Sequence, residues 1–178
     1  LGTGIGSTII IDGKIVNGSN HLAGELGHTV IVKDGRLCGC GRRGCYERYA
    51  ATSALVNDFI EEKKKHGEVI KSSSGEEIIK LVEKDDLIAS SVYKRFIQYI
   101  SIGLTNIVHF LNPEAIIIGG GIAEQADRFI QDINNEIKKE IMPIYDQDTF
   151  VFPTILGNDA GLYGACYITL KKLEQIKA

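Results

Sequence analysis

The sequence lacks several features that would place it in a special class of protein. No apolar run approaches the roughly 20 residues that a membrane-spanning helix needs, and residues Leu1–Gly6 show no basic region followed by an apolar one, so no signal peptide is predicted. Basic residues are not in excess, because 20 lysines and arginines against 23 acidic residues give a formal net charge of −3, which does not favour nucleic-acid binding. We expect a cytoplasmic protein with no membrane partner.

Methionine and cysteine are also scarce. The single methionine is Met142, so the chain does not open with an initiator and we interpret Leu1 as an internal start. Of the four cysteines, three lie between Cys38 and Cys45 while Cys166 is far away, which is a poor disulfide framework. The 178 residues, 44% hydrophobic and 24% charged, predict one globular domain, without a linker or an internal repeat.

Periodicity predicts a β-meander followed by alternating helices and strands. A hairpin joins Ser7–Ile11 to Lys14–Val16 through Asp12-Gly13, and Thr29–Val32 is a third strand. Further along, the predicted helices are Thr52–His66, Glu76–Lys84, Asp86–Leu111, Ala123–Ile141 and a last one that includes Tyr163–Leu170, with strands at Ala115–Ile118 and Thr149–Phe152. Because Ala115–Ile118 is wholly apolar, we expect it to be buried on both faces. The pattern predicts an α/β fold, a mixed β-sheet with helices on its faces.

Two glycine motifs are candidate phosphate or nucleotide sites. Gly2-Thr3-Gly4-Ile5-Gly6 is neither a Walker loop nor a dinucleotide fingerprint, but its glycines let backbone N–H groups approach an anion and Thr3 adds a hydroxyl. The alternative is a tight turn that enters a strand. Gly119-Gly120-Gly121 follows a strand and precedes a helix, where ligands of α/β sheets bind, although a simple strand-to-helix turn could also use glycine there.

The most specific pattern is His28 with Cys38, Cys40 and Cys45. Three thiolates and an imidazole form a standard tetrahedral set for structural Zn²⁺, and interleaved glycines permit the sharp turns of a loop over residues 37–47. The alternatives are a reduced thiol cluster or a Cys38–Cys45 disulfide, and a disulfide would leave Cys40 and His28 unexplained.

Two carboxylates flank these ligands, Glu25 three residues before His28 and Glu47 two residues after Cys45. Carboxylates held beside a rigid loop are good acceptors for sugar hydroxyls. The alternative is that both are solvated loop charges.

Taken in order, these motifs resemble the ROK family of bacterial sugar kinases and repressors over essentially the whole chain. The matching segments are Leu1–Gly6, Ala23–His28, Cys38–Cys45 with Glu47, Gly119–Gly121 and Gly157–Gly161. The resemblance implies the C-terminal lobe of an actin/hexokinase-type ATPase, a ribonuclease-H-like lobe that spans residues 1–178.

The resemblance also implies a role for each motif. Zn²⁺ would bind His28, Cys38, Cys40 and Cys45, while Glu25, His28 and Glu47 would contact sugar hydroxyls. Gly2, Thr3, Gly4 and Gly6 would meet the ATP phosphates, and Gly119, Gly120 and Gly121 the nucleoside end, with Mg²⁺ accompanying ATP. A homodimer is expected on the same ground.

The resemblance further implies that the general-base aspartate of the kinases lies upstream of Leu1. We therefore expect no catalytic residue within this chain, and no kinase activity from this chain alone. The parent is predicted to be an ATP-dependent kinase of a glucose-like hexose, with fructose, mannose or an N-acetylated hexosamine as rival substrates. The alternatives are the sugar-sensing lobe of a ROK-type transcriptional repressor, which alone would bring a nucleic-acid partner, and a non-catalytic sugar-binding relic.

Overall fold

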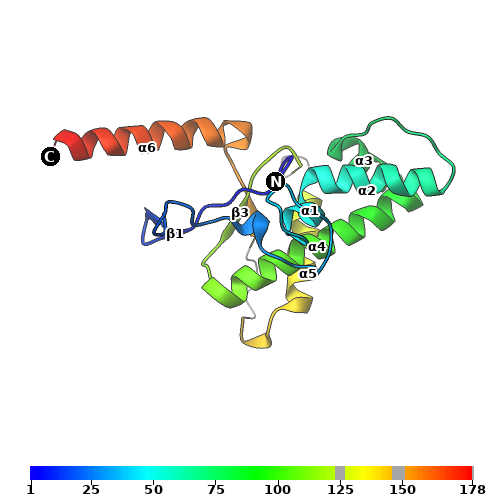
Figure 1. The fold of residues 1–178 in the computed structure, drawn as a ribbon, viewed down its shortest axis with the longest axis horizontal. Helices are drawn as coiled ribbons and strands as arrows, with labels where there is room; N and C mark the ends of the chain where they lie inside the picture. The colour runs from blue at the N-terminus through cyan, green and yellow to red at the C-terminus, as the bar shows by residue number, and fades with distance from the viewer. Residues whose placement is uncertain (123–126, 146–150, 178) are drawn as a thin grey trace.

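A long central helix organises the protein, as the computed structural model, which describes residues 1–122, 127–145 and 151–177, shows. This helix, α4 (Leu87–Leu111), packs against α1 (Glu47–Ala50), α2 (Thr52–Lys65), α3 (Gly75–Val82) and α5 (Asp127–Glu140) (Figure 1). The apolar side chains of these helices form one continuous buried core.

Local sequence explains where α4 begins and ends. The carboxylate of Asp86 accepts a hydrogen bond from the backbone N–H of Ala89 at 2.8 Å, which caps the first turn. Asn112 adopts a left-handed conformation (φ 44°) directly after the last turn, and Pro113 cannot continue the helix. The predicted helix Asp86–Leu111 is thus confirmed to within one residue.

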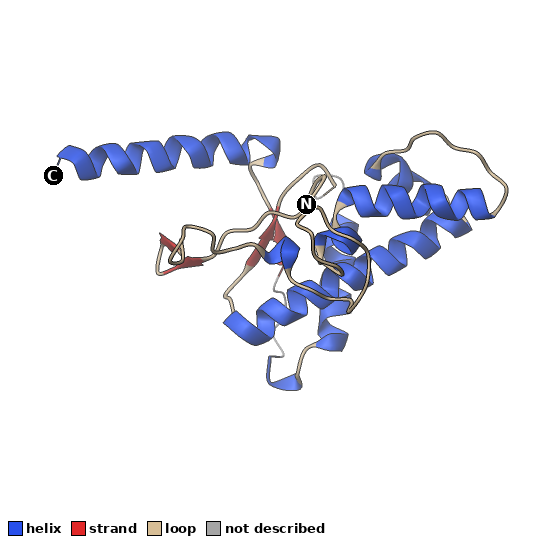
Figure 2. Ribbon diagram, in the orientation of Figure 1, coloured by secondary structure: helices blue, strands red, loops and turns tan. Residues whose placement is uncertain are grey.

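The strands are short and form two separate pairs (Figure 2). β1 (Ile10–Ile11) and β2 (Lys14–Ile15) form the predicted antiparallel hairpin, whereas β3 (Ile116–Ile118) runs parallel to β4 (Val151–Pro153). Antiparallel and parallel pairing therefore both occur, but the described residues do not join them into one sheet. The predicted starts of the last strand at Thr149 and of the fifth helix at Ala123 lie outside the described residues.

The predicted strand Thr29–Val32 is wrong, since only an isolated bridge between Val30 and Cys45 forms. The backbone N–H groups of Ile31 and Val32 both donate to the carbonyl of Gly44, at 3.0 and 3.3 Å. Two donors on one acceptor interrupt the alternating ladder of an antiparallel pair, so the segment becomes one side of the cysteine loop instead.

The expectation that β3 is buried on both faces is also wrong, because Ile117 is 62% exposed. The last helix, α6 (Ala160–Lys177), extends away from the body and does not cover this strand (Figure 1). Its large apolar side chains are exposed, namely Leu162, Tyr163, Tyr167, Ile168, Leu170 and Leu173. Across the residues that the structure describes, no helix is both long and apolar enough to span a bilayer.

Candidate functional site

The cysteine loop is a small hairpin closed by its own backbone. Cys38 donates its N–H to the carbonyl of Arg42 at 2.8 Å, and Gly44 donates to the carbonyl of Arg36 at 2.9 Å. After Cys45 the chain enters α1, and the N–H of Tyr46 donates to Thr29 at 2.8 Å, which fixes the loop beside the short 3-10 turn Leu26–His28. The loop and the turn thereby present their side chains to a common point.

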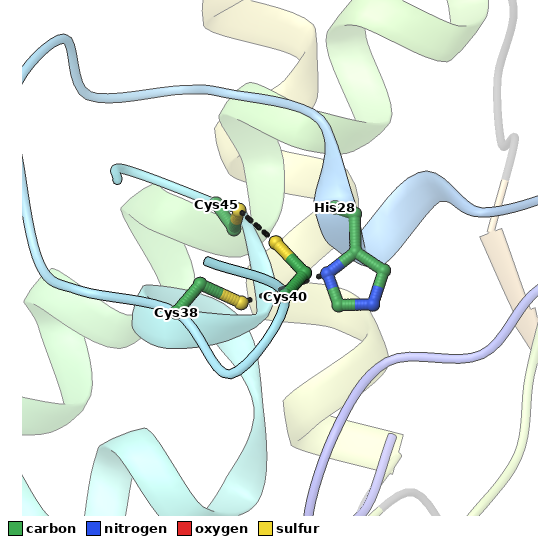
Figure 3. A group of neighbouring side chains, drawn as sticks. All are labelled: His28, Cys38, Cys40 and Cys45. Atoms are coloured by element: carbon green, nitrogen blue, oxygen red, sulfur yellow. Dashed lines mark hydrogen bonds between the residues drawn. The ribbon is translucent and has the colours of Figure 1, made fainter. Parts of the chain in front are cut away.

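The four predicted metal ligands meet at that point (Figure 3). The ligand atoms of His28, Cys38, Cys40 and Cys45 all lie within 4.8 Å of one another. The Sγ atoms of Cys40 and Cys45 are 3.6 Å apart, and the Sγ of Cys38 is 3.6 Å from Nδ1 of His28. A zinc tetrahedron with ordinary bond lengths has S–S edges of about 3.8 Å and S–N edges of about 3.6 Å. These residues therefore fit a four-coordinate zinc ion.

Without a metal ion, the three neighbouring thiols cannot all lose their protons easily, because each thiolate would repel the next. A backbone N–H from Cys40 favours the Cys38 thiolate, but burial and hydrogen bonds to Glu47 and to the other thiols raise the pKa of Cys38 to about 12. Burial likewise raises the pKa of Cys45, whereas a backbone hydrogen bond from Arg42 lowers the pKa of Cys40. Three thiolates this close need a cation between them, which is the role that zinc plays in Cys₃His sites.

The two predicted sugar-binding carboxylates lie on opposite sides of the His28 ring. Glu25 Oε2 is 4.0 Å from Nε2, and Glu47 Oε1 is 3.7 Å from Nδ1 and accepts a hydrogen bond from the Cys38 thiol at 3.1 Å. The Glu25 side chain is 62% exposed and that of Glu47 22%. Because Nδ1 faces the thiols, Nε2 is the ring nitrogen that remains for a ligand.

Close backbone contacts join this cluster to the first glycine motif. The Gly27 backbone lies so near the carbonyl of Ile5 that a Cβ at Gly27 would collide with it. A Cβ at Gly4 would lie 2.9 Å from Oε2 of Glu47. The motif Gly2–Gly6 therefore runs directly beside Glu25–His28 and Glu47.

The two glycine motifs also meet each other. The N–H of Leu1 donates to the carbonyl of Gly119 at 2.6 Å, and Gly120 has a φ of +103° and leaves no room for a Cβ beside Leu1. Gly2 and Thr3 line a cavity of about 400 Å³ together with Gly121, which we call the glycine cavity. Gly4, Gly6, Gly119 and Gly120 do not line it, and Gly6 has open space where a Cβ would point.

Sequence reasoning missed the rest of the glycine cavity. Besides Leu1, its other walls are the first two turns of α2, the start of α3 and the residue after the third glycine, namely Thr52, Ser53, Val56, Asn57, Gly75, Glu76 and Ile122. The hydroxyl of Ser53 donates to the carbonyl of Thr3 at 2.7 Å, and the Thr52 Oγ1 atom is buried without a hydrogen-bond partner. The available signal was that helices starting near Thr52 and Gly75 each present free backbone N–H groups at their first turns, but nothing in the sequence places them together.

Comparison with known proteins places these features in a family. The model of the ROK family matches residues 1–172. The glucokinase of Halalkalibacterium halodurans is 32% identical over 182 residues, which cover 94% of this chain and 54% of that protein. The xylose repressor of Bacillus spizizenii is 32% identical over 176 residues, which cover 99% of this chain and 44% of the repressor. The chain thus spans about half the length of these curated relatives.

A solved structure shows the same fold. The ROK family glucokinase from Streptomyces griseus, in complex with glucose and AMPPNP, matches with a TM-score of 0.86 at 28% identity, over 94% of this chain and 58% of that one. The predicted actin/hexokinase-type α/β lobe is confirmed by this likeness.

Proposed function

This chain belongs to the ROK family, and from that premise we propose that it is the C-terminal lobe of an ATP-dependent kinase of a glucose-like hexose. The lobe would bind the nucleotide in the glycine cavity and the sugar at Glu25, His28 and Glu47. We propose glucose as the substrate because the kinase of similar fold was solved with glucose. Fructose, mannose and N-acetylated hexosamines are the alternative substrates to test.

One observation carries the proposal: Glu47 borders both halves of the site. Its Oε1 lies 3.7 Å from His28 Nδ1, and its Oε2 lies beside Gly4. Phosphoryl transfer requires the acceptor hydroxyl and the terminal phosphate to be held side by side. A sugar whose hydroxyl donates a hydrogen bond to Glu47 would therefore lie next to ATP phosphates bound along the backbone from Gly2 to Gly6.

The glycine cavity suits the nucleoside and its phosphates. Val56 and Ile122 offer apolar surface for a base, while Thr52 contributes a buried hydroxyl that lacks a partner. The free N–H groups at the starts of α2 and α3 favour negative charge. We infer that the phosphate groups of the bound nucleotide extend from this cavity along Gly2–Gly6, with Mg²⁺ bound to them.

Zinc would support the sugar half of the site. Four protein ligands close the coordination sphere, so the ion would supply cross-linking rather than an open position for substrate. When Cys38 is a metal-bound thiolate it no longer donates to Glu47, whose oxygens then become available to sugar hydroxyls. The metal loop would in this way hold Glu47 ready to bind the sugar.

A direct test uses the full-length protein encoded by the gene that contains this chain, and this chain by itself. The full-length protein should phosphorylate glucose with ATP, measured through coupled oxidation of glucose 6-phosphate. The present chain should bind AMPPNP and glucose by calorimetry but should not phosphorylate glucose with ATP, because the general base is expected upstream. Turnover by this chain alone would contradict the missing-base argument.

Matched variants make the test specific to the site. In the full-length protein, Glu47→Gln should weaken glucose binding about 10-fold or more, because a neutral amide is a poorer acceptor than a carboxylate. Glu140→Gln, on the exposed end of α5, is the control and should bind glucose like the wild type.

The relation to the xylose repressor supports a second candidate, a sugar-sensing lobe of a transcriptional repressor. Both functions need a sugar site, so the discriminating observation is what the full-length protein does beyond binding sugar. Sugar-dependent release from operator DNA without ATP-dependent turnover would favour the repressor. Homodimer formation stays a prediction, which light scattering of the full-length protein tests.

A further inference from the structure

Arg36, which directly precedes the cysteine loop, is held by an unusually complete set of contacts. Its guanidinium lies 2.8 and 3.0 Å from the two carboxylate oxygens of Asp58, and its Nη1 donates to the carbonyl of Arg48 at 2.8 Å. The same group stacks 4.6 Å above the centre of the Tyr49 ring. The Arg36 backbone N–H also donates to the Tyr49 hydroxyl at 2.6 Å.

Asp58 is the anchor of this arrangement on α2. Its side chain is only 10% exposed, and a buried carboxylate is costly unless paired. Arg36 pairs with both oxygens through Nη2 while its Nη1 donates to the carbonyl of Arg48, and the single nitrogen of an ammonium does not offer this planar pair of donors. Arg95, on α4, forms a longer ion pair with Asp58, in which its Nη2 lies 4.0 Å from Oδ2.

The other end of the linkage is the glycine cavity. Asp58 follows, on the same helix, the residues of α2 that line the cavity, and Ser53 there holds the carbonyl of Thr3. At the loop end, the carbonyl of Arg36 accepts the Gly44 N–H, and Cys38 is two residues away. A continuous set of contacts therefore runs from the metal ligands through Arg36 and Asp58 to the cavity wall.

We propose that Arg36 and Asp58 are a positioning pair through which metal binding at the cysteine loop fixes α2 at the glycine cavity and so raises nucleotide affinity. The nucleotide part of this inference rests on the proposed function. Because linkage is reciprocal, nucleotide binding raises metal affinity by the same factor. Neither residue lines the glycine cavity, and neither is one of the proposed sugar contacts, so both act by holding α2 in place.

The first experiment follows backbone hydrogen exchange of α2 in this chain with and without Zn²⁺, and needs no nucleotide. Zinc should slow exchange in the first half of α2 in the wild type but not in Arg36→Lys, which keeps the charge but has one nitrogen in place of the two that contact Asp58 and the Arg48 carbonyl. Arg43→Lys is the matched control, since Arg43 is an exposed residue of the same loop and its Nη1 donates to the carbonyl of Gly35, at 3.2 Å, rather than to α2. Arg95→Lys makes the same replacement at the ion pair that Asp58 forms with α4, without changing a residue of the loop. Both controls should retain the zinc response.

The second experiment measures AMPPNP affinity by calorimetry in the same proteins. Zinc should tighten AMPPNP binding about 10-fold in the wild type and both controls, within the usual range of coupling, and by less than about 2-fold in Arg36→Lys. An unchanged zinc response of α2 in Arg36→Lys, or no zinc uptake by the wild type, would overturn the positioning role. If zinc slows exchange in α2 and Arg36→Lys removes this effect, but the protein does not bind AMPPNP, the positioning role stands. The proposed nucleotide site and the nucleotide part of this inference would then be overturned.

Discussion

Replacing Gly103 by alanine should destabilise this protein, although alanine is the better helix former. Gly103 lies within α4 against the flat ring of Tyr46, which is 1% exposed. A Cβ at Gly103 would overlap the Cζ atom of that ring and would lie 2.5 Å from Cε2 and 2.7 Å from Cε1. Carbon atoms in contact prefer about 3.5–4.0 Å, so the ring has to move by about 1 Å.

The size of the effect follows from three terms. Overpacking a buried ring costs about 1–3 kcal/mol, and displacing Tyr46 breaks its hydrogen bond to the carbonyl of Ile100, which is 2.8 Å long and contributes about 1 kcal/mol. Alanine in place of glycine returns about 1 kcal/mol of helix propensity. The free energy of unfolding should therefore fall by about 1–3 kcal/mol.

Urea denaturation followed by circular dichroism measures this change. Gly164→Ala is the control, because a Cβ on that residue of α6 meets nothing within 4 Å. It should leave stability unchanged or raise it by up to about 1 kcal/mol. The double variant Gly103→Ala/Tyr46→Leu should be less destabilised than the sum of the two single variants, because the ring no longer clashes. A Gly103→Ala protein as stable as the wild type would refute the packing argument.

Metal content and pH give two further tests. Cys40→Ser should reduce bound zinc below one ion per chain in metal analysis, whereas Cys166→Ser, outside the cluster, should not. Removal of the metal with a chelator should also abolish glucose binding. Normal glucose binding by the metal-free protein would contradict the role of the loop. Hydrogen bonding from the Ala89 N–H lowers the pKa of Asp86. Its charge therefore stabilises the fold above the unfolded pKa of about 4 and does so progressively less as pH falls below it. The stability advantage of the wild type over Asp86→Asn should shrink as the pH falls below about 4 in urea titrations, and a constant difference would contradict this assignment.

Helices were the part of the fold that could be predicted best. The limits of α4 depend on an aspartate cap, apolar residues at three- and four-residue spacing, and a terminal asparagine followed by proline, all of which are local. Strands were predicted less well. Thr29–Val32 has the composition of a strand, but its N–H groups share the single carbonyl of Gly44, a contact that no local pattern encodes.

The candidate site divides in the same way. The four residues of the histidine–cysteine cluster could be selected by residue type and spacing, because few side chains bind zinc and all four lie within one short stretch from His28 to Cys45. The walls of the glycine cavity could not be predicted. Thr52 and Gly75 are residue types that do not by themselves indicate a binding site, and they lie near Thr3 only because α2 and α3 pack together on α4.

The sequence by itself determined the long helices, the residues of the histidine–cysteine cluster and the family resemblance, since each depends on residue identity within a short segment, whereas the short helix α1 was not predicted. Tertiary structure alone decided that Glu47 lies beside Gly4, that Arg36 joins the cysteine loop to Asp58, and that β3 leaves Ile117 exposed. Such contacts depend on how distant segments pack to bury the apolar surface of α4, and the same local patterns are compatible with many packings.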